Sequence, residues 1–588
     1  MKSITDTLEQ RISQAIGKVT GQKGCPALVS VSKNPKFGDY QVNGVMAAAK
    51  KMKTNPRQLA EQIVEELDLD DICQPPEIAG PGFINLRLKD EFVAGRLLEI
   101  NSDKDRLGIE KVKMPKTVVV DYSGPNIAKQ MHVGHLRSTI IGDCISRMVE
   151  FEGHIVVRQN HIGDWGTQFG MLIALLKEQY PDILENPGSV EIADLEGFYQ
   201  EAKAKSDNNE AFTQTARDEV VKLHNHDKDT ITIWQHIVDE SRKHYLPIYQ
   251  QLSVTLNTKD ERGESFYADK LADVVEQLKA KKLAVESDGA MCVFPGDFKN
   301  KDGEPLPFII QKSDGAFLYA TTDLAAMRFR IDELKADKII YVTDARQSLH
   351  FQMLFETAKM AGWTNDDINL MHVTFGTMLG TDGKPFKTRT GGTVKLKDLL
   401  EEAVQRATAA VEEKNPDLPA EQKKQIAKAI GIGAVKYADY SNNRNSDFIF
   451  SFDKMLAMEG NTAPYMQYAY ARIKSIERKA EDNGVNTQNK LTGIKQLAFT
   501  EEAEKELAKM LIRYDQAIAV AAEECRPNYL TSYLYDLAQS FSRFYNACPV
   551  LKASSDQRAV RLLLCDLTAR TIKHGLTELL GIEVVEQM

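Results

Sequence analysis

The chain has 588 residues, of which 43% are hydrophobic and 27% charged, and its formal net charge is −10 at pH 7. Such a length exceeds a single hydrophobic core and predicts several domains. No stretch reaches the roughly 18 consecutive apolar residues of a membrane span, and the first residues lack a signal-peptide pattern, so we expect a cytoplasmic protein with no membrane partner. The negative charge disfavours nucleic-acid binding by the whole surface but permits local basic faces.

Metal and disulfide chemistry are not indicated by the cysteines or histidines. The seven cysteines are scattered and include no Cys-x-x-Cys pair, so we expect neither a disulfide framework nor structural zinc. Histidines 224, 226, 236 and 244 lie in a polar helical stretch without Cys or carboxylate partners at ligand spacing. We interpret them as a solvated face, with a metal-ligand set as the alternative.

Residues 1–112 are predicted to form a small α+β domain. Apolar residues recur at helical spacing over 4–16, a second helix is expected over 58–66, and Gly80-Pro81-Gly82 leads into an alternating strand at 83–88. The charged stretch 101–113 is the expected linker.

Residues 113–376 alternate strand and helix, which predicts a Rossmann-like parallel-sheet catalytic domain. An insertion is expected at about 177–315, with a short strand at 290–294. Strands are predicted at 117–121, 154–158, 338–343 and 370–375, and helices at 134–151, 323–334 and 349–361.

The most informative motif, His132-Val133-Gly134-His135, follows the first of these strands. The β-branched run 117–120 favours a buried strand, the cluster 123–126 breaks it, and apolar spacing then starts a helix. A strand that leads through Gly and Pro into a helix opened by two histidines is suited to hold a nucleoside triphosphate. The alternative is a capped helix with two surface histidines.

Strand patterns nearly vanish after residue 395. We assign 377–452 to a loop and connecting helices and 453–588 to a helical bundle. Helices are predicted at 399–413, 421–440, 465–480, 501–525, 528–547 and 558–580.

Four motifs in order resemble the class I aminoacyl-tRNA synthetases, and specifically the arginyl-tRNA synthetases. The His-x-Gly-His motif is joined by Asn160–Gly170 (NHIGDWGTQFG), Asp344–His350 (DARQSLH) and Glu459–Tyr468 (EGNTAPYMQY). Four ordered matches are far more specific than one.

The resemblance implies ATP-dependent attachment of L-arginine to tRNA(Arg) through an arginyl-adenylate, with AMP and pyrophosphate released. It implies ATP as substrate with Mg²⁺ on its phosphates, no DNA partner, and a monomer. It also implies that tRNA is needed for the first step, and that the C-terminal bundle binds the anticodon while the N-terminal domain contacts the tRNA elbow.

The implied catalytic residues are His132, His135, Lys129, Lys384 and Lys387, and those implied to bind ATP are His132, Gly134, His135, His161, His350 and Lys387. The second class I signature, normally Lys-Met-Ser-Lys-Ser, corresponds to Lys384-Pro385-Phe386-Lys387-Thr388 and lacks the Met-Ser centre. In this family Lys129 is thought to offset that loss. A basic Gly-rich surface loop is the alternative for the second segment.

The implied arginine pocket contains Asn126, Glu264, Tyr319, Asp323 and Gln347. A guanidinium is planar and always charged, so its selection requires carboxylate acceptors. Tyr319 and Asp323, four residues apart, are expected on one helix face. Asp323 alternatively serves as an acid favoured at a helix N-terminus.

The implied tRNA-binding residues are Asp39, Tyr40, Gln41, Tyr465, Arg472 and Tyr529. The aromatic ones suit stacking on unpaired bases. Ordinary turn residues at 39–41 and bundle core at 465 and 529 are the alternatives.

Three other functions compete with this interpretation. A small-molecule nucleotidyltransferase shares the histidine motif but leaves the helical C-terminal part unexplained. A non-catalytic tRNA-binding paralogue would be expected to lack a signature residue, and a synthetase for another amino acid conflicts with Tyr319, Asp323 and Gln347.

Overall fold

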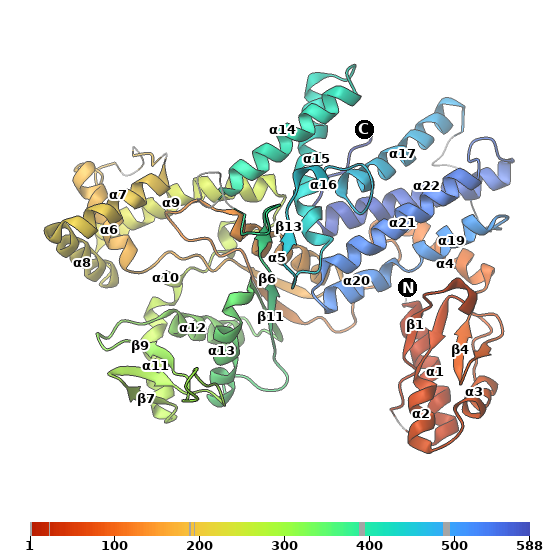
Figure 1. The fold of residues 1–588 in the computed structure, drawn as a ribbon, viewed down its shortest axis with the longest axis horizontal. Helices are drawn as coiled ribbons and strands as arrows, with labels where there is room; N and C mark the ends of the chain where they lie inside the picture. The colour runs from red at the N-terminus through yellow and green to blue at the C-terminus, as the bar shows by residue number, and fades with distance from the viewer. Residues whose placement is uncertain are drawn as a thin grey trace.

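The computed structural model describes residues 3–22, 24–186, 188, 190–192, 194–386, 394–485, 494 and 496–588. Figure 1 shows a central sheet region between the insertion helices on one side and the C-terminal helices on the other. The N-terminal domain lies beside the C-terminal helices, far from the insertion. Within the described ranges no helix is long and apolar enough to cross a membrane.

The N-terminal domain packs helices on a small antiparallel sheet of order β1-β2-β4-β3. The Ser3 side chain caps the first helix, and apolar residues four apart bury its inner face. The predicted helices and the strand at 83–88 are confirmed, but the other three strands escaped prediction because each has only three residues. The elements are α1 (Ile4–Thr20), β1 (Val29–Val31), η1 (Pro35–Phe37), β2 (Tyr40–Val42), α2 (Gly44–Met52), α3 (Pro56–Glu65), β3 (Glu77–Ala79), β4 (Phe83–Leu86) and α4 (Asp90–Ser102).

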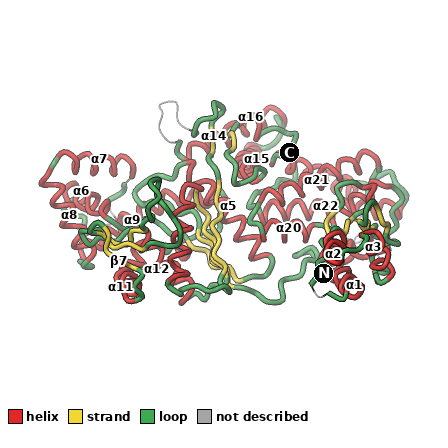
Figure 2. Tube along the Cα trace, turned by 60° about the horizontal axis from the view of Figure 1, so that its bottom comes forward, coloured by secondary structure: helices red, strands yellow, loops and turns green. Residues whose placement is uncertain are grey.

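The catalytic sheet has the order β11-β10-β5-β6, and every pair in it is parallel. All four predicted strands are confirmed to within a residue or two. Because the strands are parallel, their carboxyl ends share one edge, where α/β sheets bind ligands. Figure 2 shows the strands flanked by helices. The elements are β5 (Thr117–Asp121), α5 (Val133–Phe151), β6 (Ile155–Gln159), α12 (Tyr319–Asp332), β10 (Lys338–Asp344), η5 (Ala345–Gln347), α13 (Ser348–Met360) and β11 (Asn369–Phe375).

An inserted region separates β6 from β10. It contains a group of helices and then an antiparallel sheet β7-β8-β9, whose hydrophobic core is shared with α11 and α12. The short strand predicted at 290–294 is β8, and its two neighbours were not predicted. The elements are α6 (Thr167–Gln179), α7 (Leu195–Asn208), α8 (Glu210–His224), α9 (Lys228–Gln251), η3 (Thr258–Asp260), α10 (Glu264–Tyr267), η4 (Ala268–Lys270), α11 (Leu271–Ala280), β7 (Ala284–Ser287), β8 (Ala290–Val293) and β9 (Phe308–Gln311).

The C-terminal part is helical apart from a short parallel pair, β12-β13. The predicted helix 501–525 is instead two helices broken at residues 512–513, both of which pack on α21. The predicted helix 558–580 ends in a π-helical turn, η6. The elements are β12 (Met378–Leu379), α14 (Leu396–Lys414), α15 (Ala420–Tyr440), β13 (Phe448–Ile449), α16 (Phe452–Met455), α17 (Ala463–Asp482), α19 (Glu502–Leu511), α20 (Tyr514–Glu523), α21 (Pro527–Ala547), α22 (Ser555–Lys573) and η6 (His574–Leu579).

Buried polar contacts join α5 to the C-terminal helices. Arg137 donates from Nε to Asp439 Oδ2 at 2.8 Å and from Nη1 to the carbonyl of Gly376 at 2.6 Å. The Tyr440 hydroxyl donates to the carbonyl of Ile140 at 2.9 Å. Since α5 begins at the histidine motif, these contacts set the position of the site.

Candidate active site

The histidine motif forms the first turn of α5, and its two side chains cap the helix reciprocally. His132 Nδ1 accepts from the Gly134 N–H at 3.0 Å, and His135 Nδ1 accepts from the His132 N–H at 3.1 Å. The ring centroids are 4.0 Å apart. An imidazole whose Nδ1 accepts a hydrogen bond carries its proton on Nε2, so both rings present an Nε2–H donor.

Both histidines are neutral near pH 7. Burial and the neighbouring His132 lower the pKa of His135 to about 3, and burial lowers the pKa of His132 as well. The site therefore offers oriented neutral donors at the N-terminus of a long helix, an arrangement suited to phosphate oxygens.

Lys129 lies on the same side of the site. Its ammonium is 4.6 Å from the ring centroid of Tyr199 on α7, and its charge contributes to lowering the pKa of His132. The structure thus brings Lys129 and His132 together, and the insertion helix α7 supplies the aromatic contact. No pattern in the sequence indicated that α7 would contact Lys129.

The second signature segment lies beyond β12, and only part of it is described. Lys384 is exposed in a turn where the Gly380 N–H donates to the Lys384 carbonyl at 2.7 Å. Lys387, with Thr388 and Arg389, lies outside the described residues.

The chain just after that segment pairs with the histidine motif. The Val133 N–H donates to the Val394 carbonyl at 3.1 Å, and the Leu396 N–H donates to the Met131 carbonyl at 2.9 Å. The chain that follows the second signature, from Val394 onward, is therefore hydrogen-bonded to the histidine motif through the backbone. No local pattern in the sequence predicts this contact, because it joins residues about 260 positions apart.

Three carboxylates gather beside the loop that follows β6. Asp164 accepts from the backbone N–H of Ser265 at 2.9 Å and from its hydroxyl at 2.7 Å. A Cβ at Gly263 would lie 2.3 Å from Asp164 Oδ2, so this approach requires glycine. Burial, followed by the charges of Asp164 and Asp323, raises the pKa of Glu264 to about 8. Asp164 lies within the NHIGDWGTQFG motif but is not among the predicted site residues.

Asp323 and His350 form a close pair. Asp323 Oδ2 is 2.6 Å from His350 Nε2, and the His350 ring packs against Phe308 and Phe351. Tyr319, at the start of α12, is 73% exposed, one turn before Asp323. His350, which was expected to border adenosine, therefore contacts Asp323, which was expected to bind arginine.

The loops after β5 and β6 are joined at Asn126 and His161. Asn126 forms a parallel bridge with Gly163, where a Cβ would lie 2.5 Å from Asn126 Oδ1. His161 Nδ1 is 3.0 Å from the Arg262 carbonyl oxygen, and its ring is 5.6 Å from that of Tyr267. Gln347 is exposed at the end of η5, after β10. These predicted residues all follow strands at the carboxyl edge of the sheet.

Two of the three N-terminal residues that were expected to bind tRNA are buried. Asp39 and Tyr40 are only 8% and 1% exposed, and both face the C-terminal helices. Asp39 Oδ1 is 3.0 Å from Lys509 Nζ, and the Arg513 guanidinium lies 5.4 Å from the Tyr40 ring centroid. This burial is unsuited to direct tRNA contact, and Gln41 alone of the three keeps a partly exposed side chain.

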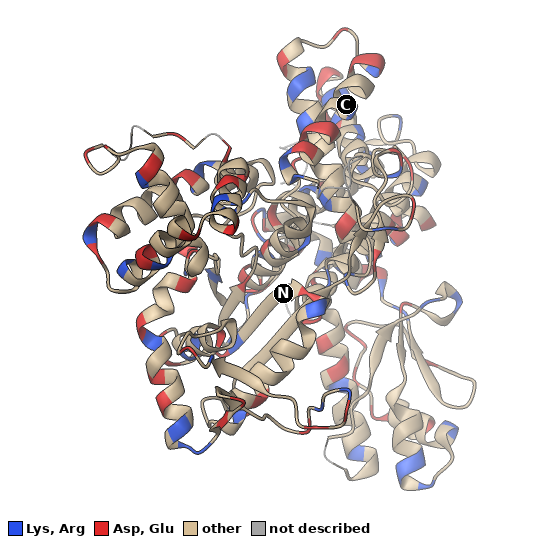
Figure 3. Cartoon of the chain, turned by 60° about the vertical axis from the view of Figure 1, so that its left-hand side comes forward, with Lys and Arg blue, Asp and Glu red and all other residues tan. Residues whose placement is uncertain are grey.

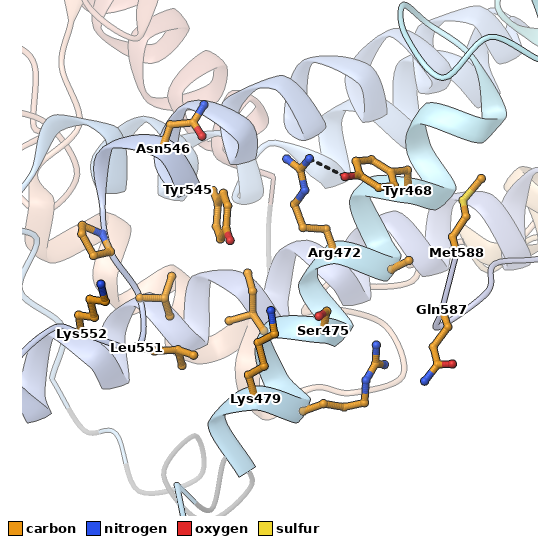
Figure 4. Close-up of a pocket in the computed structure, with 15 residues that line it drawn as sticks. Tyr468, Arg472, Ser475, Lys479, Tyr545, Asn546, Leu551, Lys552, Gln587 and Met588 are labelled. Carbon is orange, nitrogen blue, oxygen red and sulfur yellow. Dashed lines mark hydrogen bonds between the residues drawn. The ribbon is translucent and has the colours of Figure 1, made fainter. Parts of the chain in front are cut away.

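Arg472 lines a cavity of about 740 Å³ between α17 and the segment after α21. Figure 4 shows its guanidinium between Tyr468 and Tyr545, with a 2.9 Å hydrogen bond to the Tyr468 hydroxyl. Lys479 and Lys552 also line the cavity. Tyr465 and Tyr529 are partly buried and pack against the hydrophobic core, Tyr465 beside Tyr535.

Charges of both signs are interspersed along the helices in Figure 3. The basic cavity around Arg472 is thus a local feature of a chain whose net charge is negative. Within the described ranges, no group of three or more His, Cys, Asp or Glu could hold a metal ion.

Three protein-family models match consecutive parts of the chain. Residues 97–452 match the family of class I (R) tRNA synthetase catalytic domains, 466–588 match the DALR anticodon binding domain, and 6–88 match the arginyl tRNA synthetase N-terminal domain.

Full-length relatives and solved structures agree with these matches. The arginine–tRNA ligases of Chromobacterium violaceum and Cellvibrio japonicus are 51% and 52% identical over 586 and 588 residues, each covering 100% of both chains. The crystal structure of Plasmodium falciparum arginyl-tRNA synthetase superposes with a TM-score of 0.84 at 31% identity, and that of the Thermus thermophilus enzyme with 0.81 at 26%, each again over 100% of both chains.

Proposed function

The chain belongs to the arginyl-tRNA synthetase family, and from this premise we propose that it attaches L-arginine to tRNA(Arg) in translation. An arginine carboxylate oxygen attacks the α-phosphorus of ATP, and the bond to the β-phosphate oxygen breaks to release pyrophosphate. A hydroxyl of the tRNA terminal ribose then attacks the arginyl carbonyl, and AMP leaves.

One observation carries this proposal: two fixed imidazole donors and three clustered carboxylates lie at the same edge of the sheet. Phosphoryl displacement needs positioning and charge stabilisation more than a protein nucleophile. A guanidinium needs carboxylate acceptors. The site supplies both. The histidines lie in the first turn of α5, and the carboxylates lie on the loop after β6, on α10 and on α12.

For ATP we propose that the Nε2–H groups of His132 and His135 donate to phosphate oxygens, with the Gly134 backbone approaching closely. Lys129 adds positive charge beside them, and Lys384 and Lys387 act from the second signature. His161 borders the nucleoside. Mg²⁺ accompanies the ATP phosphates, because it binds phosphate oxygens with few protein ligands.

For arginine we propose that Glu264 and Asp323 accept from the guanidinium, with Tyr319 beside them. Asn126 and Gln347 contact the amino and carboxylate end. The 2.6 Å contact supports a role for His350 in orienting Asp323, in place of a direct contact with adenosine.

For tRNA we propose that the cavity around Arg472 receives unpaired anticodon bases. Its tyrosines supply stacking surfaces, and its lysines supply charge for phosphates. Gln41 remains the candidate at the tRNA elbow, whereas Asp39 and Tyr40 hold the N-terminal domain in place. Tyr465 and Tyr529 do not line this cavity, and we assign them to packing against the hydrophobic core.

The domain division 1–112, 113–376, 377–452 and 453–588 is part of the proposal, as are a cytoplasmic location and a monomer of 65.9 kDa. Light scattering would test the last point. The matches at both ends of the chain disfavour a small-molecule nucleotidyltransferase, which has no use for an anticodon-binding domain.

The deciding experiment is ATP–pyrophosphate exchange with each amino acid, with and without tRNA(Arg). We expect exchange only when arginine and its tRNA are both present. Exchange with lysine, or robust exchange without tRNA, would contradict the specific assignment, and no exchange with any amino acid would favour a non-catalytic tRNA-binding protein.

A further inference from the structure

A second cavity, of about 610 Å³, lies where three parts of the chain meet. Its walls come from the linker after α4, from the C-terminal end of α5, and from α22 with η6. Helix α5 has 19 residues, so this cavity lies about 28 Å along the helix from the histidine motif. None of its lining residues belongs to the site proposed above.

Cations outnumber anions in this cavity, although the whole chain is negatively charged. Lys104, Arg106, Arg570 and Lys573 line it, against two acidic residues. Across the ranges that the structure describes, neither the Lys104 nor the Lys573 ammonium group has a hydrogen bond or an ion pair, and both residues are exposed. The two ammonium groups are therefore available to a ligand.

The two arginines are held in place mainly by neutral groups. Arg106 donates to the carbonyls of Ile109 at 2.9 Å and Phe151 at 2.6 Å, and its guanidinium lies 4.2 Å from the Phe151 ring centroid. Arg570 donates from Nη2 to the carbonyls of Ile100 at 3.1 Å and Asp103 at 2.9 Å. Carbonyl oxygens orient a guanidinium without neutralising its charge.

Among the described residues, one ion pair with a carboxylate is formed by these two arginines. Arg570 Nη1 has a longer contact of 3.4 Å with Asp566. Burial lowers the pKa of Arg106, opposed by the charge of Asp103. The cavity wall therefore retains net positive charge.

The aromatic residues of the cavity lining are uncharged. His574 Nδ1 is 2.8 Å from the Tyr514 hydroxyl, and the His574 ring meets the Phe151 ring edge-on at 4.5 Å between centroids. Burial lowers the pKa of His574 to about 4, so the imidazole is neutral at physiological pH. His574 also begins the π-helical turn η6, and such turns occur frequently at functional sites.

We propose that this cavity binds a phosphate-bearing ligand, through the two free lysines and the two oriented arginines. Its volume lies within the range of small-molecule sites and suits a group the size of a mononucleotide. Arginine and lysine are the side chains that recognise phosphate. The phosphate comes either from a free nucleotide or oligophosphate, or from the tRNA backbone.

Lysine footprinting on the full-length protein tests the proposal. Amine acetylation would be followed at each lysine by mass spectrometry with inorganic tripolyphosphate, with tRNA(Arg), or with sodium chloride at matched ionic strength. We expect severalfold slower acetylation of Lys104 and Lys573, with no change at Lys301, an exposed lysine in a distant turn. Protection by tripolyphosphate identifies a free ligand, and protection by tRNA alone identifies the backbone. Protection by neither probe overturns the proposal.

A pair of matched variants gives a second measurement. Lys104→Gln with Lys573→Gln, and Lys51→Gln with Lys301→Gln, remove the same charge from different places. Tripolyphosphate should raise the Tm of the wild type and of the second variant more than that of the first, since a ligand stabilises the state it binds. If tRNA is the ligand, the first variant should instead show a raised KM for tRNA. Equal behaviour of the two variants in both assays contradicts the site. The proposed aminoacylation activity does not depend on this outcome.

Discussion

The carboxyl edge of the catalytic sheet and the contacts between domains are both rich in ionisable side chains, yet they use them differently. Between domains, Arg137 pairs with Asp439 at 2.8 Å and Asp39 with Lys509 at 3.0 Å. At the sheet edge, the structure gives His132 and His135 hydrogen bonds through Nδ1, and among the described residues it gives neither Nε2 a partner. Paired charges hold the domains together, whereas two imidazoles with an unused Nε2–H donor mark the substrate site.

The largest effect is expected from breaking a buried ion pair. Arg137→Met leaves Asp439 buried without its cation, which should lower the free energy of unfolding by about 3–5 kcal/mol. Urea denaturation would measure it. The double variant Arg137→Met with Asp439→Leu should recover most of the loss, because no charge is then left uncompensated. A single variant as stable as the wild type would show that the pair is not structural.

Removing a donor at the sheet edge should affect rate more than stability. We expect His135→Ala to lower kcat for tRNA-dependent ATP–pyrophosphate exchange about 10²–10³-fold, the usual loss for one transition-state donor. The lost helix cap should cost only about 1 kcal/mol of unfolding free energy. An unchanged kcat, or a loss of activity fully explained by unfolding, would remove His135 from the catalytic group.

Asp323 and His350 are paired, like the side chains between domains, but they lie at the sheet edge. Mutation can show whether the pair serves substrate binding. Asp323→Asn should raise the KM for arginine about 10–100-fold and leave the KM for ATP nearly unchanged, because a charge-assisted contact of about 1.5–3 kcal/mol is lost. His350→Gln should raise the KM for arginine if the imidazole orients Asp323. A rise in the KM for ATP alone would instead support a contact between His350 and adenosine.

Glu264 predicts a pH dependence of arginine binding. Its pKa is about 8 in the free protein, and the guanidinium binds the ionised carboxylate, so affinity should rise with pH up to about 8 and then level off. Between pH 7 and 8 the ionised fraction grows about fivefold, and the Kd for arginine should fall by the same factor. Calorimetry in buffers of different ionisation enthalpy would detect the released proton. Glu264→Gln should abolish the slope, and a slope that persists would assign it to another group.

The raised pKa of Glu264 also affects stability. Its folded pKa exceeds the unfolded value of 4.5, so the folded state holds the proton more tightly. The free energy of unfolding therefore falls as pH rises from about 4.5, and the loss is complete once pH has passed about 8.

The smallest effect is expected at the contact between the N-terminal and C-terminal domains. The Asp39→Asn amide oxygen can still accept from Lys509 and Arg513, so the loss should be about 0.5–1 kcal/mol and the KM for tRNA should rise about two- to fivefold. The KM values for arginine and ATP should not change. Asp71→Asn is the matched control, because Asp71 pairs with Arg11 inside the N-terminal domain. Equal effects of the two variants would mean that net charge matters and domain position does not.

Local patterns in the sequence determined the secondary structure and the main signature. The run 117–120 is β-branched and buried, and it forms β5 as predicted. The apolar spacing after His132 forms α5, and the glycine and proline positions end the strand before it. Such features depend on neighbours within about four residues, so the sequence displays them directly.

Tertiary structure alone decided which of these elements meet. The sequence predicted Asp323 and His350 for different ligands, and placed Asp39 and Tyr40 on an exposed surface. The structure pairs the first two and buries the second two, joins Met131 to Leu396, and splits the helix expected at 501–525. Each outcome depends on residues tens to hundreds of positions away. Periodicity shows that a face is polar or apolar, but not which other part of the chain will cover it.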